Sequence, residues 1–395
     1  MDHCDCLPEA LHFGLPVSRK LRLSVIVPAK DEADFILKTL DALRLQLDGS
    51  GNPVQFDVYE VLVLANNCND QTFEICKQYQ ETHHLFNLGV ECLFIKDPSK
   101  AHIGTVRRLL MDAAFNRLGK NGIIVSTDAD SEVDPYWVYN IVSEIEDGAD
   151  VVGGRIISRD TPALSKLQHL RNVKYRFLSA RVESQLDPCP VNSWPRHFQC
   201  FGPSLAVTCE MYDRAGRLPA IPYLEDEEFR KALKRVDAII RHSPKVKIFT
   251  SARLQGRVEF GFSVQLRKWG VMASNSQEEH VEAFDTLIYK YRIKSELRRQ
   301  WNSGLTCEVK WDEKYAKKIN ISIDYLNSLR SGLKYFEAFW EEIENHLRVS
   351  HPSKFSLKPI SEAIQELNNY FHHHNLSEKK NIQHGLARRC KIAEM

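Results

Sequence analysis

Residues 122–130 read GIIVSTDAD, a short apolar strand that runs directly into two aspartates, Asp128 and Asp130. On both sides of this stretch, apolar β-branched runs alternate with segments whose apolar residues recur at helical spacing. Such alternation predicts an α/β fold, a mostly parallel, Rossmann-like sheet flanked by helices. Ligands of such sheets bind outside the carboxyl ends of the strands, so the residues after each strand are candidates for the site. The other expected strands cover residues 23–28, 58–65, 92–95, 149–157, 201–207, 238–240 and 246–249.

The pattern changes after about residue 270. Apolar residues there recur in steps of three and four, from Leu326 to Leu347 and from Leu357 to Phe371, which predicts amphipathic helices. We therefore expect an N-terminal lead over residues 1–20, a sheet domain over 21–270 and a C-terminal all-α extension over 271–395. The extension is expected to pack on the sheet domain or on a second copy of the chain in a homodimer.

Composition excludes several classes of protein. The 395 residues include 53 Lys and Arg against 52 Asp and Glu, a formal net charge of +1, which argues against general nucleic-acid binding. No stretch reaches the roughly 18 apolar residues of a membrane helix. The ten cysteines show no Cys-x-x-Cys pair, so we expect no zinc site and a reduced, cytoplasmic protein.

The two carboxylates of Asp128 and Asp130 follow a strand and lie one residue apart. Carboxylate oxygens in this arrangement suit a hard divalent cation, Mn²⁺ or Mg²⁺, that keeps positions open for phosphate oxygens. An Asp-x-Asp by itself is also common in solvated turns. Its place after the fourth strand of an alternating fold favours the metal interpretation.

Four motifs, in order, resemble those of the family 2 glycosyltransferases, which have the GT-A fold. They are residues 25–32 (VIVPAKDE), 66–72 (NNCNDQT), 128–130 (DAD) and 224–229 (LEDEEF). The resemblance covers about residues 20–270. It implies metal-dependent, inverting transfer of a sugar from a nucleoside diphosphate to an acceptor hydroxyl that the motifs do not identify. A UDP-sugar is favoured over a GDP-sugar, although Ala65 replaces an acid that the family usually carries.

The resemblance also implies a donor-binding role for residues at the strand ends. Glu32 has an alternative interpretation as a carboxylate favoured at a helix start, and Asp70 has one as a helix N-cap. Arg107 opens the third helix, where a guanidinium can bind phosphate through paired donors. The implied donor-binding set is Pro28, Ala29, Glu32, Asn66, Asp70, Arg107, Asp128, Arg253 and Arg257.

The same resemblance assigns the chemistry to the acids of residues 225–228. Asp226 is the candidate general base and Glu225 the second candidate, although acids at a helix start are common for dipole reasons alone. Asp130 and Asp128 are the candidate metal ligands, and His242 is a possible additional one, with a surface histidine as the alternative.

Two other functions compete with transfer. A nucleotide-sugar-binding scaffold without turnover would fit the altered Ala65. A sugar-phosphate nucleotidyltransferase would need a glycine-rich basic loop after the first strand, whereas residues 28–32 read PAKDE.

Overall fold

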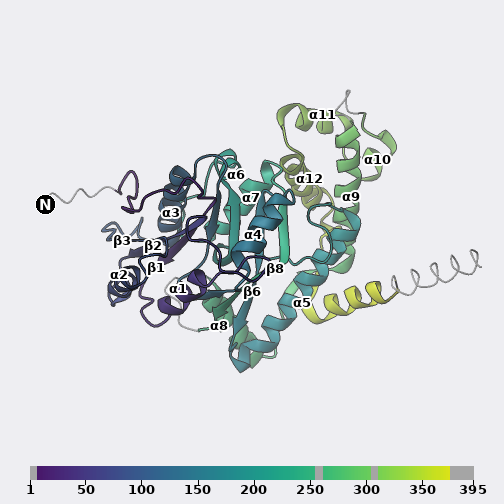
Figure 1. Ribbon diagram of the computed structural model, residues 1–395. Coiled ribbons are helices and arrows are strands. Elements are labelled where there is room, and N and C mark those ends of the chain that lie inside the picture. The colour runs from purple at the N-terminus through teal and green to yellow at the C-terminus, as the bar shows by residue number, and fades with distance from the viewer. Residues whose placement is uncertain (1–6, 254–260, 304–309, 374–395) are drawn as a thin grey trace, which may run out of the picture.

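The computed structural model describes residues 7–253, 261–303 and 310–373. Its centre is an eight-stranded sheet with the order β3-β2-β1-β4-β7-β6-β8-β5 (Figure 1). β7 runs antiparallel to both of its neighbours and β5 runs antiparallel to β8, while the other neighbouring strands are parallel. The α/β prediction of a mostly parallel sheet is confirmed. The strands are β1 (Leu23–Ala29), β2 (Tyr59–Asn66), β3 (Leu88–Leu93), β4 (Ile123–Ser126), β5 (Ser131–Val133), β6 (Val151–Arg159), β7 (Leu205–Thr208) and β8 (Ile240–Ser251).

Helices cover both faces of the sheet, because alternate residues of each central strand point to opposite sides. In β1, Val25 and Val27 pack against α1, α2 and α4, whereas Ile26 faces the core that α3, α6 and α7 share. These helices are α1 (Ile36–Arg44), α2 (Thr72–Thr82), α3 (Ile103–Leu118), α4 (Trp137–Glu146), α6 (Cys209–Arg214) and α7 (Glu225–Arg235).

Four strands differ from the prediction: besides β3 and β8, β5 was not expected, and β7 begins at Leu205, four residues later than expected. β3 begins four residues earlier than expected, at Leu88. The two runs expected near residues 238–249 form one strand, β8, whose register against β6 shifts where Gly154 and Arg155 pair with Ser243 and Lys247. Pro244 lies within this irregularity, so the break in the sequence pattern marks a bulge rather than the end of a strand.

The C-terminal region is helical apart from one short antiparallel pair, β9 (His280–Glu282) and β10 (Leu357–Pro359). The long helix α5 (Ala163–Leu186) joins it to the sheet domain, since Tyr175, Leu178 and Val182 share an apolar cluster with residues of α9 and of the helical segment 360–373 (Figure 1). The domain boundary at 270/271 stays a prediction, and α8 runs across it. The helices are α8 (Phe262–Ser274), α9 (Phe284–Ser303), α10 (Glu313–Lys318), α11 (Ile323–Gly332) and α12 (Phe336–Ser350).

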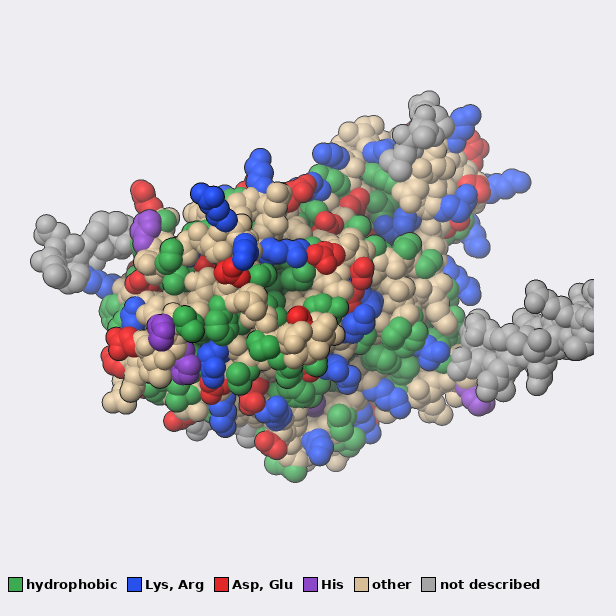
Figure 2. Space-filling view, in the orientation of Figure 1, with side chains coloured by type: hydrophobic (Ala, Val, Ile, Leu, Met, Phe, Trp, Pro, Cys, Tyr) green, Lys and Arg blue, Asp and Glu red, His purple; other side chains and the backbone are tan. Residues whose placement is uncertain are grey.

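Within the described ranges, every helix is too short or too polar to cross a membrane. On the face shown in Figure 2, acidic and basic side chains are interspersed. This distribution agrees with the near-zero net charge.

Candidate active site

The carboxylates of Asp128 and Asp130 lie just beyond the end of β4, and each contacts an arginine from a distant part of the chain. Arg107 of α3 donates from Nη2 to Oδ1 of Asp128 at 2.8 Å. Arg253, which follows β8, places its Nη2 atom 3.3 Å from Oδ2 of Asp130. The strand order brings these residues together, because β4 lies inside the sheet and β5, directly after Asp130, pairs with the end of β8.

Burial makes these two acids difficult to ionise together. It raises the pKa of Asp128, and it raises the pKa of Asp130 to about 7, with the negative charge of Asp128 adding to the effect. A divalent cation between the two groups would remove this repulsion, and oxygen ligands are those that Mn²⁺ and Mg²⁺ prefer. The donor set therefore fits the predicted metal.

Arg107 is the buried centre of the site. Its side chain is 5% exposed, and its two terminal nitrogens contact Glu225 and Asp128. A Cβ atom at position 202 would overlap the Arg107 guanidinium, so the glycine there makes room for it. Arg107 thus forms a bridge between the Asp-x-Asp motif and the first turn of α7, and its contact with the donor stays a prediction.

The turn before α7 holds that helix in place. Leu224 has a left-handed backbone with a φ of 57°, which is uncommon for a residue with a branched side chain. Three residues earlier, the Ile221 carbonyl oxygen lies so close to Gly104 of α3 that a Cβ atom at position 104 would overlap it. The start of α3 and the chain leading into α7 are therefore in backbone contact.

The two candidate bases differ in their surroundings. Glu225 is buried against Arg107, and burial raises its pKa. The carboxylate of Asp226 is less buried and accepts backbone N–H bonds from Gly202 and Glu227, both at 2.8 Å. These two bonds fix the Asp226 carboxylate, and its negative charge acts on Asp128. Asp226 thus lies close to the metal motif, and its role as the base stays a prediction.

The predicted nucleoside end of the pocket lies beside β1 and β2. Glu32 is 7% exposed and accepts two bonds from the Arg253 guanidinium, at 2.6 and 2.9 Å. Pro28 and Ala29 are buried residues of β1. Asn66, at the end of β2, is buried, and its side chain makes no hydrogen bond with any residue that the structure describes.

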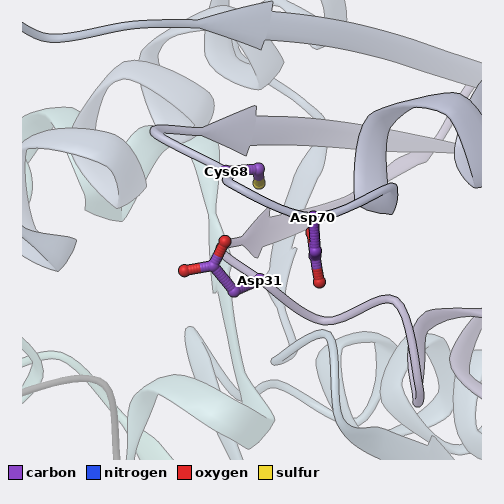
Figure 3. Close-up of side chains that lie close together, drawn as sticks. All are labelled: Asp31, Cys68 and Asp70. Atoms are coloured by element: carbon purple, nitrogen blue, oxygen red, sulfur yellow. The ribbon is translucent and has the colours of Figure 1, made fainter.

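Asp31, Cys68 and Asp70 lie together on the turns after β1 and β2, with one ligand atom of each within 4.8 Å of the others (Figure 3). Their acids already have local partners. Asp31 accepts the N–H of Asn69 at 2.6 Å, and Asp70 accepts those of Thr72 and Ala33 at 3.0 Å each. Asp70 therefore orders the start of α2, although the N-cap position itself is Gln71 and not Asp70 as the alternative had it. The sequence does not predict the bond between Asp31 and Asn69. The left-handed backbone of Asp31, with a φ of 52°, is set by the fold and has no signal in the sequence.

His242 is not near the other candidate metal ligands. It pairs with Gly153 of β6, whereas Thr250, which pairs with Ser131 beside Asp130, lies opposite Ser158. Five residues of β6 separate the two points, about 16 Å at the usual rise of about 3.3 Å per strand residue. Burial instead lowers the pKa of His242 well below its ordinary value. The prediction of His242 as a metal ligand is therefore wrong. Arg257 lies outside the described residues.

A comparison with known protein families matches part of the chain. Residues 24–194 match the sequence model of glycosyl transferase family 2. This segment runs from β1 through the Asp-x-Asp motif to the end of α5 and beyond. The predicted family is thereby confirmed for this segment, which makes up less than half of the chain. No curated protein matches the sequence.

Among solved structures, the chain is distantly similar to TarS of S. aureus in complex with UDP, with 14% identity over 78% of this chain and 79% of that one and a TM-score of 0.41. It is also similar to the mannosyltransferase PcManGT from Pyrobaculum calidifontis in complex with GDP-Man and Mn²⁺, with 16% identity, 87% and 85% coverage and a TM-score of 0.42. A third is glucosyl-3-phosphoglycerate synthase from Mycobacterium tuberculosis, with 16% identity, 66% and 84% coverage and a TM-score of 0.35. Similarity at this level does not define the donor or the acceptor.

Proposed function

We propose that this chain transfers a sugar from a nucleoside diphosphate donor, UDP rather than GDP, to an acceptor hydroxyl, with inversion at the anomeric carbon. The supporting observation is the arrangement of acids around Arg107, which joins Asp128 of the metal motif to Glu225, the neighbour of Asp226. The groups for donor binding and for base chemistry thus meet at one edge of the sheet.

Asp226 is the general base of this proposal. Its carboxylate takes the proton of the acceptor hydroxyl as the acceptor oxygen bonds to the anomeric carbon. The bond from that carbon to the diphosphate oxygen breaks, and the diphosphate leaves with the electron pair. Attack from the face opposite the leaving group inverts the configuration. The backbone N–H groups of Gly202 and Glu227 hold the carboxylate in one orientation throughout.

Asp130, together with Asp128, would hold Mn²⁺ or Mg²⁺, which when bound supplies positive charge next to the departing diphosphate. Arg253 contacts Glu32 and Asp130 in the structure, and its guanidinium is the nearest described cation that could exchange these carboxylates for phosphate oxygens.

Asn66 is the residue that we propose contacts the base of the donor, while the choice of UDP over GDP rests on the family resemblance. Its amide offers one donor group and one acceptor, which match the N3–H and a carbonyl oxygen of uracil. Its burial at the end of β2, without a partner among the described residues, leaves both groups available.

The test compares three variants in a transfer and donor-hydrolysis assay with Mn²⁺, alongside calorimetric UDP binding. We expect Asp226→Asn to lower the rate by about 10²-fold or more while UDP affinity is kept. Asp130→Ala should remove the metal dependence of UDP binding. Glu228→Gln, on the same helix and paired with Lys231, is the matched control and should behave like the native chain.

Normal turnover by Asp226→Asn would refute the base assignment. UDP binding without turnover of any sugar, over a broad acceptor screen, would support the nucleotide-sugar-binding scaffold instead.

A further inference from the structure

A cavity of about 210 Å³ lies between the last turn of α7 and the helices α5, α9 and α12. It is separate from the candidate active site, since Lys234 of the cavity follows Asp226 by eight residues, about 12 Å along a helix. Both the sheet domain and the C-terminal region contribute to its walls.

The cavity is lined by charged side chains, and nearly all of them are paired. Its four carboxylates contact arginines or lysines: Glu183 with Arg196, Glu337 with Lys294 and Arg298, Glu341 with Arg235, and Glu344 with Arg348. Two further lysines of the lining are paired as well, Lys231 with Glu228 and Lys290 with Glu282.

Lys234 is the exception. No residue in the described part of the chain forms an ion pair or hydrogen bond with its ammonium group. Burial lowers the pKa of Lys234, and the positive charges of Lys294 and Arg230 lower it further. The carboxylates of Glu183 and Glu337, which are paired with other cations, act in the opposite direction and offset part of this lowering.

Tyr291 of α9 adds a second group of the same kind. Its hydroxyl, on the lining of the cavity, has no hydrogen-bond partner among the described residues, and burial raises the pKa of Tyr291 well above its ordinary value. The hydroxyl thus stays protonated and can donate to a ligand. Two donors without a partner among the described residues therefore line one cavity, where a single ligand rich in acceptor atoms can contact both.

We propose that this cavity is a binding site for a small phosphate-bearing anion, held by the Lys234 ammonium group and the Tyr291 hydroxyl. Several oxygens on one centre allow a phosphate group to accept from both donors at once, and charge-assisted bonds of this kind are strong. The flexible side chain of Arg235 at the same lining can supply a further contact. The inference does not depend on the proposed transferase reaction.

The position of the site links it to that reaction. Lys234 belongs to the last turn of α7, and Glu225 and Asp226 belong to its first turn. An anion at Lys234 bridges α7 to α9 of the C-terminal region through Tyr291. Its binding is therefore expected to stabilise the docking of the C-terminal region on the helix that carries the candidate base.

The test measures binding of inorganic phosphate to the full chain by calorimetry, with the active site saturated with UDP. We expect Lys234→Gln to weaken phosphate binding by about tenfold or more and Tyr291→Phe by less, because the first removes a charged donor and the second a neutral one. Lys231→Gln is the matched control, on the same helix and at the same cavity, and should stay within about twofold.

Crystals soaked in tungstate locate the anion directly. An anomalous peak within hydrogen-bond distance of Lys234 Nζ, lost in Lys234→Gln, is the expected result. Equal phosphate affinity in native and Lys234→Gln chains, no measurable binding, or an anion only beside Arg253 and Asp130 would each overturn the proposal. The thermal transition of each variant shows whether it is folded. If Lys234→Gln does not fold, Lys234→Met takes its place before affinities are compared.

Discussion

Replacing Arg107 with methionine should both destabilise the fold and disrupt the candidate active site. Arg107 and Glu225 are each 5% exposed, so removal of the guanidinium leaves the Glu225 carboxylate buried without a counter-charge. Such a loss costs about 3–5 kcal/mol of the free energy of unfolding. The contribution from Asp128 is smaller, because its side chain is 34% exposed and water can solvate it.

The measurement is urea unfolding of the native chain, Arg107→Met, Glu225→Gln and the double variant. A favourable interaction appears as a double variant that is less destabilised than the sum of the two single changes, since Glu225→Gln removes the charge that Arg107→Met exposes. UDP binding by the same proteins reports on the site, and we expect Arg107→Met to weaken it because Asp128 loses its fixed position.

Arg117→Met is the matched control. Arg117 donates to the buried Glu60 at 2.7 and 2.9 Å, so its loss should also lower stability, but this pair contacts none of the candidate site residues and UDP affinity should not change. A destabilisation of Arg107→Met below about 1 kcal/mol, or additive effects of Arg107→Met and Glu225→Gln, would refute the account of a buried bridge.

Three more outcomes can be checked. Gly202→Ala should lower donor binding and stability together, because the new methyl group overlaps the Arg107 guanidinium; a variant with native urea midpoint and UDP affinity would contradict this. His197 is 5% exposed and its pKa falls to about 4 because of burial, so the folded state keeps it neutral while the unfolded chain binds a proton below about pH 6.5. Its contribution to stability is complete above pH 6.5 and declines as the pH falls toward 4; between pH 7 and pH 5 the native chain should lose about 2 kcal/mol more than His197→Asn, and equal losses would argue against a buried neutral imidazole. Deletion of residues 271–395 should give insoluble protein, because it uncovers the apolar face of α5 that includes Leu178 and Val182; a soluble and active truncation would show that the C-terminal region is an independent module.

The elements with strong periodic patterns were predictable from the sequence. The strand ending at Ser126 and the helix over 163–186 lie where the patterns predict them. The spacing of apolar residues in each segment follows from which of its faces is buried. The continuous strand β8 was not predictable, because its bulge interrupts the pattern of apolar residues. The motif acids were found, but the partners of Arg107 were not, since Glu225 lies 118 residues away and only the fold brings the two together. The prediction that His242 binds the metal was wrong because the sequence does not show at which end of β8 this residue lies.

Redesign of the turn before α7 would begin with one fixed spacing. The segment around Ile221, which leads into α7, passes so close to Gly104 that there is no space for even one additional carbon atom. New side chains can be introduced into that segment, provided that residue 104 remains a glycine. A library that varies residues 219–224 while holding Gly104 constant should therefore contain more folded members than one that varies both.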